Sequence, residues 1–139
     1  MNLTQVVDTT LKSFRAEVPE YLASAVVDLS TGMLLDADTV DDHPREILDI
    51  LAAATADLFR GRTVTQIESL WHERRLALGV EAEVHWFQEI LTHSDTLAHL
   101  FLRSRSSPEI VAAVVCRREV NLGMLFAQAR HVMRGLDAQ

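Results

Sequence analysis

The chain has 139 residues, 48% of them hydrophobic and 24% charged, with a formal net charge of −7 at pH 7. This composition is typical of one folded domain and excludes a disordered chain. The acidic balance argues against a nucleic-acid-binding protein, which normally carries a basic face. No apolar run approaches the roughly 20 residues that span a bilayer, and residues 1–18 lack the pattern of a signal peptide. We therefore expect a cytoplasmic protein without a membrane segment.

The first predicted elements are a helix and a β-hairpin. Residues 3–16 carry apolar side chains at intervals of three and four, which predicts an amphipathic helix. Residues 21–29 and 33–37 are short apolar runs separated by Ser-Thr-Gly, a sequence typical of a hairpin turn. Gly32 is at the turn position that needs a positive φ angle, so we interpret it as a structural residue.

An acidic, polar loop is predicted over residues 38–44. Four aspartates in and beside it raise the question of a cation site: Asp36, Asp38, Asp41 and Asp42. The segment lacks the glycine and the distal glutamate of a calcium-binding loop. A solvated loop before a helix explains it better, with Asp42 or His43 near the cap and Pro44 in the first turn.

Residues 45–60 predict the most informative helix, because apolar residues go most of the way around it. A surface helix normally has one apolar stripe, whereas a helix that is apolar nearly all round is covered on two sides. In a domain of this size the second cover is expected to come from another molecule. The residues that we assign to this dimer or partner interface are Ile47, Ile50, Leu51, Ala54 and Leu58.

A short amphipathic helix is predicted after Gly61, with its apolar residues between Val64 and Leu78. Thr63 and Gln66 have the spacing of a capping box at its start. Trp71 has two interpretations: an anchor for a partner protein, or a side chain packed onto its own domain.

β-strand patterns return in the last third of the chain. Residues 84–93 and 96–104 predict a second hairpin, and residues 110–117 a further strand. A final helix is predicted from Asn121 to Gly135. The order helix, two strands, helix, extra helix, three strands, helix predicts an α/β fold, a five-stranded, mostly antiparallel sheet between helices.

The residues that could carry catalysis or bind a metal do not form a convincing pattern in the sequence. His85, His93 and His99 fall on one hairpin, and His93 with His99 would suit zinc if both shared a face. That face is otherwise largely apolar, so partly exposed histidines on a sheet are expected instead. Cys116 lies within an apolar run and is interpreted as a buried residue. No nucleotide-binding or nucleophile motif occurs, and we predict no catalytic, cofactor-binding or metal-binding residue.

The stretch from Arg118 to Arg130 contains Asn121 and Gly123, two residues apart between a predicted strand and helix. A glycine at a helix start can hold a phosphate group, but no second glycine and no lysine support that use here. Asn121 is interpreted as a helix cap. Gly123 is interpreted as a position where a side chain would collide with the neighbouring sheet or helix.

Two stretches, SAVVDLSTGMLL and EIVAAVVCRREVNLGMLFAQAR, together with the element order, resemble the roadblock/dynein light chain family. The resemblance covers roughly residues 3–60 and 83–136. It implies a profilin-like α/β/α sandwich that forms homodimers, with second helices (45–59) packed together and sheets joined through the strand at 85–92. On that strand the implied interface residues are Trp86, Gln88 and Ile90.

The resemblance further implies a non-catalytic regulator or scaffold, often for small Ras-like GTPases. Residues 61–82 depart from it as an insertion that could cap a sheet edge or block the usual dimer. Two other functions were considered. One is a small-molecule sensor with a pocket near Trp71, Trp86 and Phe87, and the other is a metal-dependent enzyme built on the histidines.

Overall fold

The computed structural model describes residues 2–42, 45–80 and 85–139. Its centre is a five-stranded sheet in which neighbouring strands are antiparallel, in the order β2-β1-β5-β4-β3. The strands are β1 (Tyr21–Asp28), β2 (Met33–Thr39), β3 (Glu89–His93), β4 (Leu97–Arg103) and β5 (Ile110–Arg117). The predicted sheet and its strand number are confirmed.

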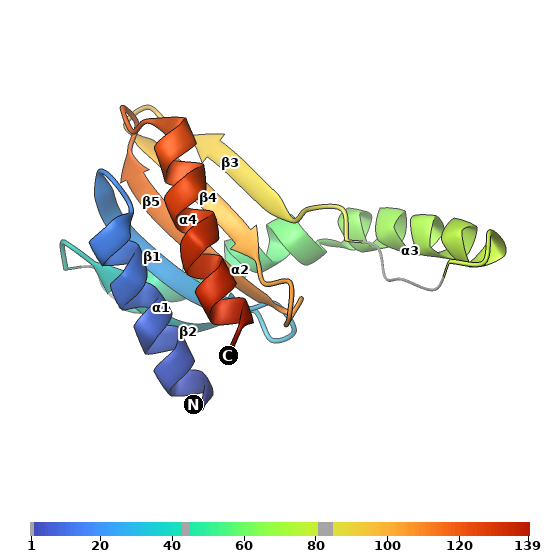
Figure 1. Ribbon diagram of the computed structural model, residues 1–139. Helices are drawn as coiled ribbons and strands as arrows, with labels where there is room; N and C mark the ends of the chain where they lie inside the picture. The colour runs from blue at the N-terminus through green and yellow to red at the C-terminus, as the bar shows by residue number, and fades with distance from the viewer. Residues whose placement is uncertain (1, 43–44, 81–84) are drawn as a thin grey trace.

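Helices cover both faces of this sheet (Figure 1). Helices α1 (Leu3–Glu17) and α4 (Leu122–Asp137) lie on one face, and α2 (Arg45–Arg60) lies on the other. The predicted α/β/α sandwich is therefore confirmed. No helix in the described part of the chain is long and apolar enough to cross a membrane.

The main core lies between the sheet and the α1–α4 pair. Phe14 of α1 and Leu125 of α4 are fully buried against Leu100 and Val114 of the central strands. Each such side chain stabilises the fold by about 1.5–3 kcal/mol. The other face is less completely covered, because α2 alone packs there.

Phe59, near the end of α2, is the main buried residue on that second face. Its ring meets Phe87 and Phe101 edge-on, with centroid distances of 6.5 and 6.4 Å. Phe87 precedes β3 and Phe101 lies on β4. The end of α2 is thereby fixed beside the β3 edge of the sheet.

The two glycine positions singled out in the sequence behave differently. Gly32 has a φ of 71° in the turn between β1 and β2, as that turn requires. Asn121 caps α4, since its Oδ1 accepts a hydrogen bond from the Met124 amide at 3.0 Å. The collision expected at Gly123 is not found. A Cβ there would approach only the Asn121 Oδ1, at 3.3 Å, so this exposed glycine faces neither the sheet nor another helix.

The segment predicted as an insertion contains α3 (Arg62–Ala77), a 16-residue helix with no buried residue. Figure 1 shows it projecting beyond the β3 edge, in continuation of α2. The predicted capping box at Thr63 and Gln66 is wrong. Gly61 is the cap residue without a side-chain hydrogen bond, and its amide donates to the Asp57 carbonyl at 2.8 Å, so α3 starts directly after α2.

Strand β3 is shorter than the sequence predicts. It begins at Glu89, so Trp86 and Gln88 precede it rather than belong to it. The Gln88 carbonyl still accepts a hydrogen bond from the Arg103 amide at 2.8 Å, and the Gln88 side-chain amide donates to the Arg103 carbonyl at 2.7 Å. The Phe87 carbonyl, one residue earlier, accepts from the Arg103 guanidinium at 3.1 Å. The predicted start of this strand and the end of the insertion, like His43 and Pro44, lie outside the described residues.

Candidate interaction surface

Helix α2 has a buried face and an exposed apolar face. On the buried face Ala52, Thr55 and Phe59 recur at intervals of three and four. The Thr55 hydroxyl donates to the Leu51 carbonyl at 2.9 Å, which satisfies this buried polar group within the helix. These contacts, with Leu48 and Ala56 packed beside them, orient α2, and they leave several other apolar residues of the helix largely exposed to solvent.

The exposed face carries every α2 residue predicted for an interface. We call this set the α2 stripe: Ile47, Ile50, Leu51, Ala54 and Leu58. Ile50 is 69% exposed and Leu51 57%. Single exposed apolar residues are common on protein surfaces, whereas a contiguous row marks an interaction site. The α2 stripe is such a row, since its members recur at helical spacing on one side.

The β3 edge is the second open feature. β3 is the last strand of the sheet and is hydrogen-bonded only to β4 among the described residues. An edge strand presents unpaired amide and carbonyl groups that another strand can pair with. Of the predicted interface residues, Ile90 lies within β3 and is half-buried against Phe59 and Phe101. Gln88 lies outside the strand, and its amide is engaged within the same chain.

Three aromatic rings join α3 to the segment before β3. Trp86 stacks on Phe87 with a centroid distance of 4.8 Å, and Trp71 meets Trp86 edge-on at 5.8 Å. Trp71 remains 42% exposed. It therefore combines both sequence interpretations, since part of the ring packs on its own chain and the remainder faces solvent.

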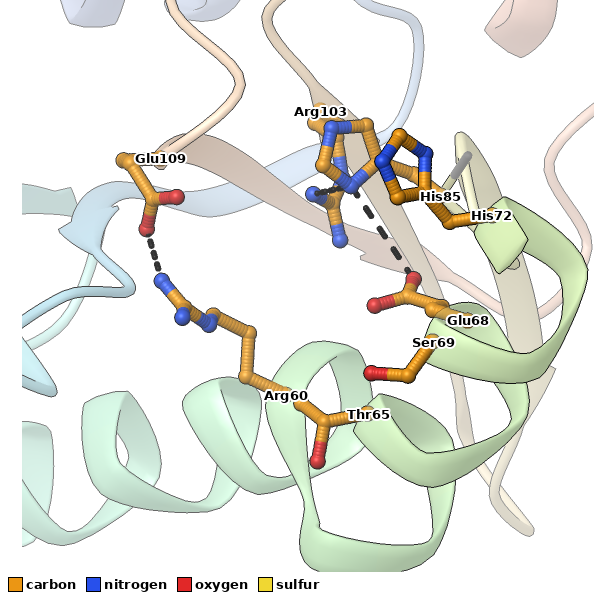
Figure 2. Close-up of a pocket in the computed structure, with 8 residues that line it drawn as sticks. All are labelled: Arg60, Thr65, Glu68, Ser69, His72, His85, Arg103 and Glu109. Atoms are coloured by element: carbon orange, nitrogen blue, oxygen red, sulfur yellow. Dashed lines mark hydrogen bonds and ion pairs between the residues drawn. The ribbon is translucent and has the colours of Figure 1, made fainter. Parts of the chain in front are cut away.

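A polar cluster, which sequence reasoning missed, holds the base of α3 (Figure 2). Its centre is Arg103 at the end of β4, only 3% exposed. The guanidinium donates to the Phe87 carbonyl at 3.1 Å and the Pro108 carbonyl at 3.2 Å, and it lies over the Phe59 ring. It also lies 2.8 Å from His85 Nδ1. Burial lowers the pKa of Arg103.

Glu68 connects this cluster to α3. Its carboxylate accepts a hydrogen bond from the Trp86 amide at 2.7 Å and lies 4.0 Å from His85 Nδ1. Arg60 pairs with Glu109 on the other side of the same hollow, which has a volume of about 300 Å³. Two carboxylates and two guanidinium groups balance in charge here. The arrangement joins α2 and α3 to the segments that precede β3 and β5.

A second cavity, of about 180 Å³, lies between α2 and the sheet. Its walls are almost entirely apolar and include Leu51 and Leu58 of α2 with Phe101 and Val115 of the sheet. The pocket considered for a small-molecule sensor was placed near Trp71, Trp86 and Phe87. Those rings pack on one another instead, and they do not line this cavity.

His93 and His99 are not brought together as the considered zinc site would require. Thr92 pairs with His99 and His93 with Ala98, so His93 and His99 point to opposite faces of the sheet. Within residues 2–42, 45–80 and 85–139, no group of three or more potential ligands is arranged to hold a metal ion. Cys116 is buried, and burial raises the pKa of its thiol to about 11.

Several charged residues noted in the sequence form ion pairs within the chain. Asp38 accepts hydrogen bonds from Arg15 at 2.7 Å and from the Tyr21 hydroxyl at 2.6 Å, which joins β2 to α1. Arg130 of α4 pairs with Glu89 at the start of β3 at 2.7 Å. Asp38 thus has a structural partner inside the chain.

Comparisons with known proteins give a clear answer for the fold. MglB from Myxococcus xanthus superposes with a TM-score of 0.67 at 14% identity, over 99% of this chain and 96% of that one. An MglB structure described as having a tetrameric arrangement gives 0.64 at 15% identity, over 99% and 90%. A Roadblock/LC7 domain from Streptomyces avermitilis gives 0.59 at 14% identity, over 99% and 97%. No protein-family model and no curated protein matches the sequence.

These likenesses define the class: the chain has a roadblock-like fold. The predicted resemblance is therefore confirmed at the level of the fold. The sequence identities are too low to carry more than that.

Proposed function

We propose that this protein is a non-enzymatic, homodimeric regulator or scaffold that binds another protein, with a small Ras-like GTPase as the partner class. The observation that carries the proposal is the α2 stripe, an exposed apolar row on the helix beside an open sheet edge. The GTPase follows from the roadblock-like fold and the resemblance that the sequence shows, and from no residue of this chain.

The homodimer combines two contacts. The α2 stripe of one protomer packs against its partner, and the β3 edges pair to join the two sheets. Burial of the isoleucine and leucine side chains of the α2 stripe supplies about 1.5–3 kcal/mol for each fully buried residue. The tetrameric arrangement described for one MglB structure supports self-association as a property of this fold.

Sedimentation equilibrium of the purified chain tests the dimer, for which we expect twice the mass of 15.6 kDa at micromolar concentration. A monomer across the concentration range would contradict it. The partner class is tested by mixing the dimer with a purified small Ras-like GTPase from the same organism, loaded with GDP or a GTP analogue. Binding that depends on the nucleotide supports regulation, and no binding in either state contradicts the GTPase assignment.

The apolar cavity between α2 and the sheet favours a second candidate function, the binding of a small hydrophobic molecule. A ligand that binds the folded state raises the melting temperature without any partner protein. A screen of small apolar compounds that raises it would support this sensor function. A screen without a shift would leave the protein-binding function as the better account.

A further inference from the structure

Helix α3 contacts the rest of its chain through a few side chains, among them Glu68 and Trp71 in the middle of the helix. None of its 16 residues is buried, and Leu70 is 64% exposed. An isolated helix of this length is marginal in water, and helices in proteins are normally stabilised by packing of an apolar face. The exposed apolar residues of α3 therefore require a surface that the isolated chain does not supply.

We propose that α3 packs in trans, along the α2 stripe of the second protomer. This inference rests on the proposed homodimer and goes beyond it by assigning the inserted helix a role in the interface. The occupant of the α2 stripe is then largely α3 of a second copy of the same chain.

The position of the α2–α3 junction supports this arrangement. Phe59 packs against Ile90 of β3 and against Phe87, so the following Gly61 lies beside the β3 edge. When two β3 edges pair, the two-fold axis passes at this edge. A helix that continues beyond the edge then enters the space beside the partner's sheet, on the face where α2 lies (Figure 1).

The length of α3 fits that space. Its 16 residues span about 24 Å at a rise of 1.5 Å per residue. The outer strands of a five-stranded sheet are about 19 Å apart at the usual strand spacing. The helix is thus long enough to cross the partner's sheet beside the partner's α2.

The same symmetry predicts a register. Because the helices run antiparallel across an axis near the junction, residues equally distant from the junction meet. Leu70 and Trp71 then face the partner's Leu51 and the partner's Ile50. The apolar part of α3 meets the most exposed part of the α2 stripe, so both surfaces lose their contact with water.

Charge complements this register. Arg74 and Arg75 lie in the last turn of α3, and both are exposed. In the proposed register they come beside the partner's Glu46, at the start of α2. An opposite-charge pair at this place fixes the antiparallel direction and adds a modest, salt-dependent attraction.

Contacts within the chain orient α3 for this role. The Glu68 carboxylate accepts a hydrogen bond from the Trp86 amide at 2.7 Å, and Trp71 packs edge-on against Trp86. These contacts hold the first half of α3 beside the segment that leads into β3. The helix is thereby directed away from its own sheet.

Cross-linking tests the register directly. Two chains with different tags, one carrying Leu70→Cys and the other Leu51→Cys, are co-expressed, purified together and oxidised mildly. Native Cys116 is buried, and the unsubstituted chain reports any background. We expect a disulfide-linked heterodimer on a non-reducing gel. Asp8→Cys on α1 replaces Leu51→Cys in the control pair, for which no cross-link is expected.

The same sample separates the possible failures. A dimer by sedimentation that gives no Leu70–Leu51 cross-link would overturn the trans arrangement and leave the homodimer standing. A monomer would overturn both. Leu70→Glu is expected to weaken dimerisation at least tenfold with an unchanged far-UV spectrum. Leu3→Glu, which changes an exposed leucine on α1, leaves it unchanged, and equal dissociation constants for the two variants would contradict the proposal.

Discussion

The Nη1 atom of Arg103 lies 2.8 Å from Nδ1 of His85, and this contact joins the end of β4 to the segment before β3. Arginine can only donate a hydrogen bond, so the guanidinium is the donor and the His85 ring nitrogen the acceptor in this contact. With its bonds to the Phe87 and Pro108 carbonyls, Arg103 fixes the place from which α3 departs.

Replacing Arg103 tests this role. Arg103→Met removes the donors from two carbonyls and one imidazole nitrogen in a buried place, so we expect a loss of about 2–4 kcal/mol in the free energy of unfolding. Urea unfolding, followed by tryptophan fluorescence, measures it. The matched control is Arg105→Met, two residues along and exposed, expected to stay within about 0.5 kcal/mol. An equal loss of unfolding free energy in both variants would contradict the special role of Arg103.

A pair of glycine substitutions tests the turn and the helix start. Gly32→Ala places a side chain at a φ of 71°, which costs about 1–2 kcal/mol. Gly123→Ala meets only the Asn121 Oδ1 that caps the helix, at 3.3 Å, and gains helix propensity. The melting temperature should therefore fall for Gly32→Ala and change less for Gly123→Ala, and the reverse order would contradict both assignments.

Acid sensitivity should change when Asp38 is replaced. The hydrogen bond from the Arg15 guanidinium, assisted by the Tyr21 hydroxyl, lowers the pKa of Asp38 in the folded state. The stabilisation is therefore present above the unfolded pKa near 3.8 and is lost as the pH falls through the lower folded value. Asp38→Asn should melt at a lower temperature than the native chain at pH 7, with the difference narrowing in strong acid. A difference independent of pH would be inconsistent with this account.

The Cys116 thiol should be unreactive in the folded protein. The thiol is buried, and its pKa is raised to about 11, so little thiolate exists at pH 8. A thiol-specific reagent should react slowly with the native chain and rapidly in denaturant. Fast reaction under native conditions would show that β5 opens or that the thiol lies at the surface.

Much of the fold could be predicted from local sequence patterns. The helical spacing in residues 3–16 and the apolar run at 110–117 correspond to α1 and β5, because each buries one side against the same core. The two-sided apolar character of residues 45–60 also corresponds to a real division, with Phe59 inward and Ile50 outward.

Other features could not be predicted because they depend on distant contacts. Arg103 ends an ordinary strand and, in the sequence, is typical of a solvated residue, since its partners at residues 85–87 and 108 are brought together only by folding. The same guanidinium binds the Phe87 carbonyl, just before the residues where β3 begins. The direction of α3 likewise depends on Glu68 reaching Trp86 across a separation of 18 positions.

The central claim is that the α2 stripe forms the homodimer, and the mass of Leu51→Asp in solution tests it most directly. An aspartate in the middle of this apolar interface leaves a charge away from water. Multi-angle light scattering should give a folded monomer for Leu51→Asp and a dimer for the native chain. Asp57→Asn, which removes a charge from an exposed α2 position outside the stripe, should remain dimeric. A Leu51→Asp variant that elutes as an unaltered dimer would contradict the account.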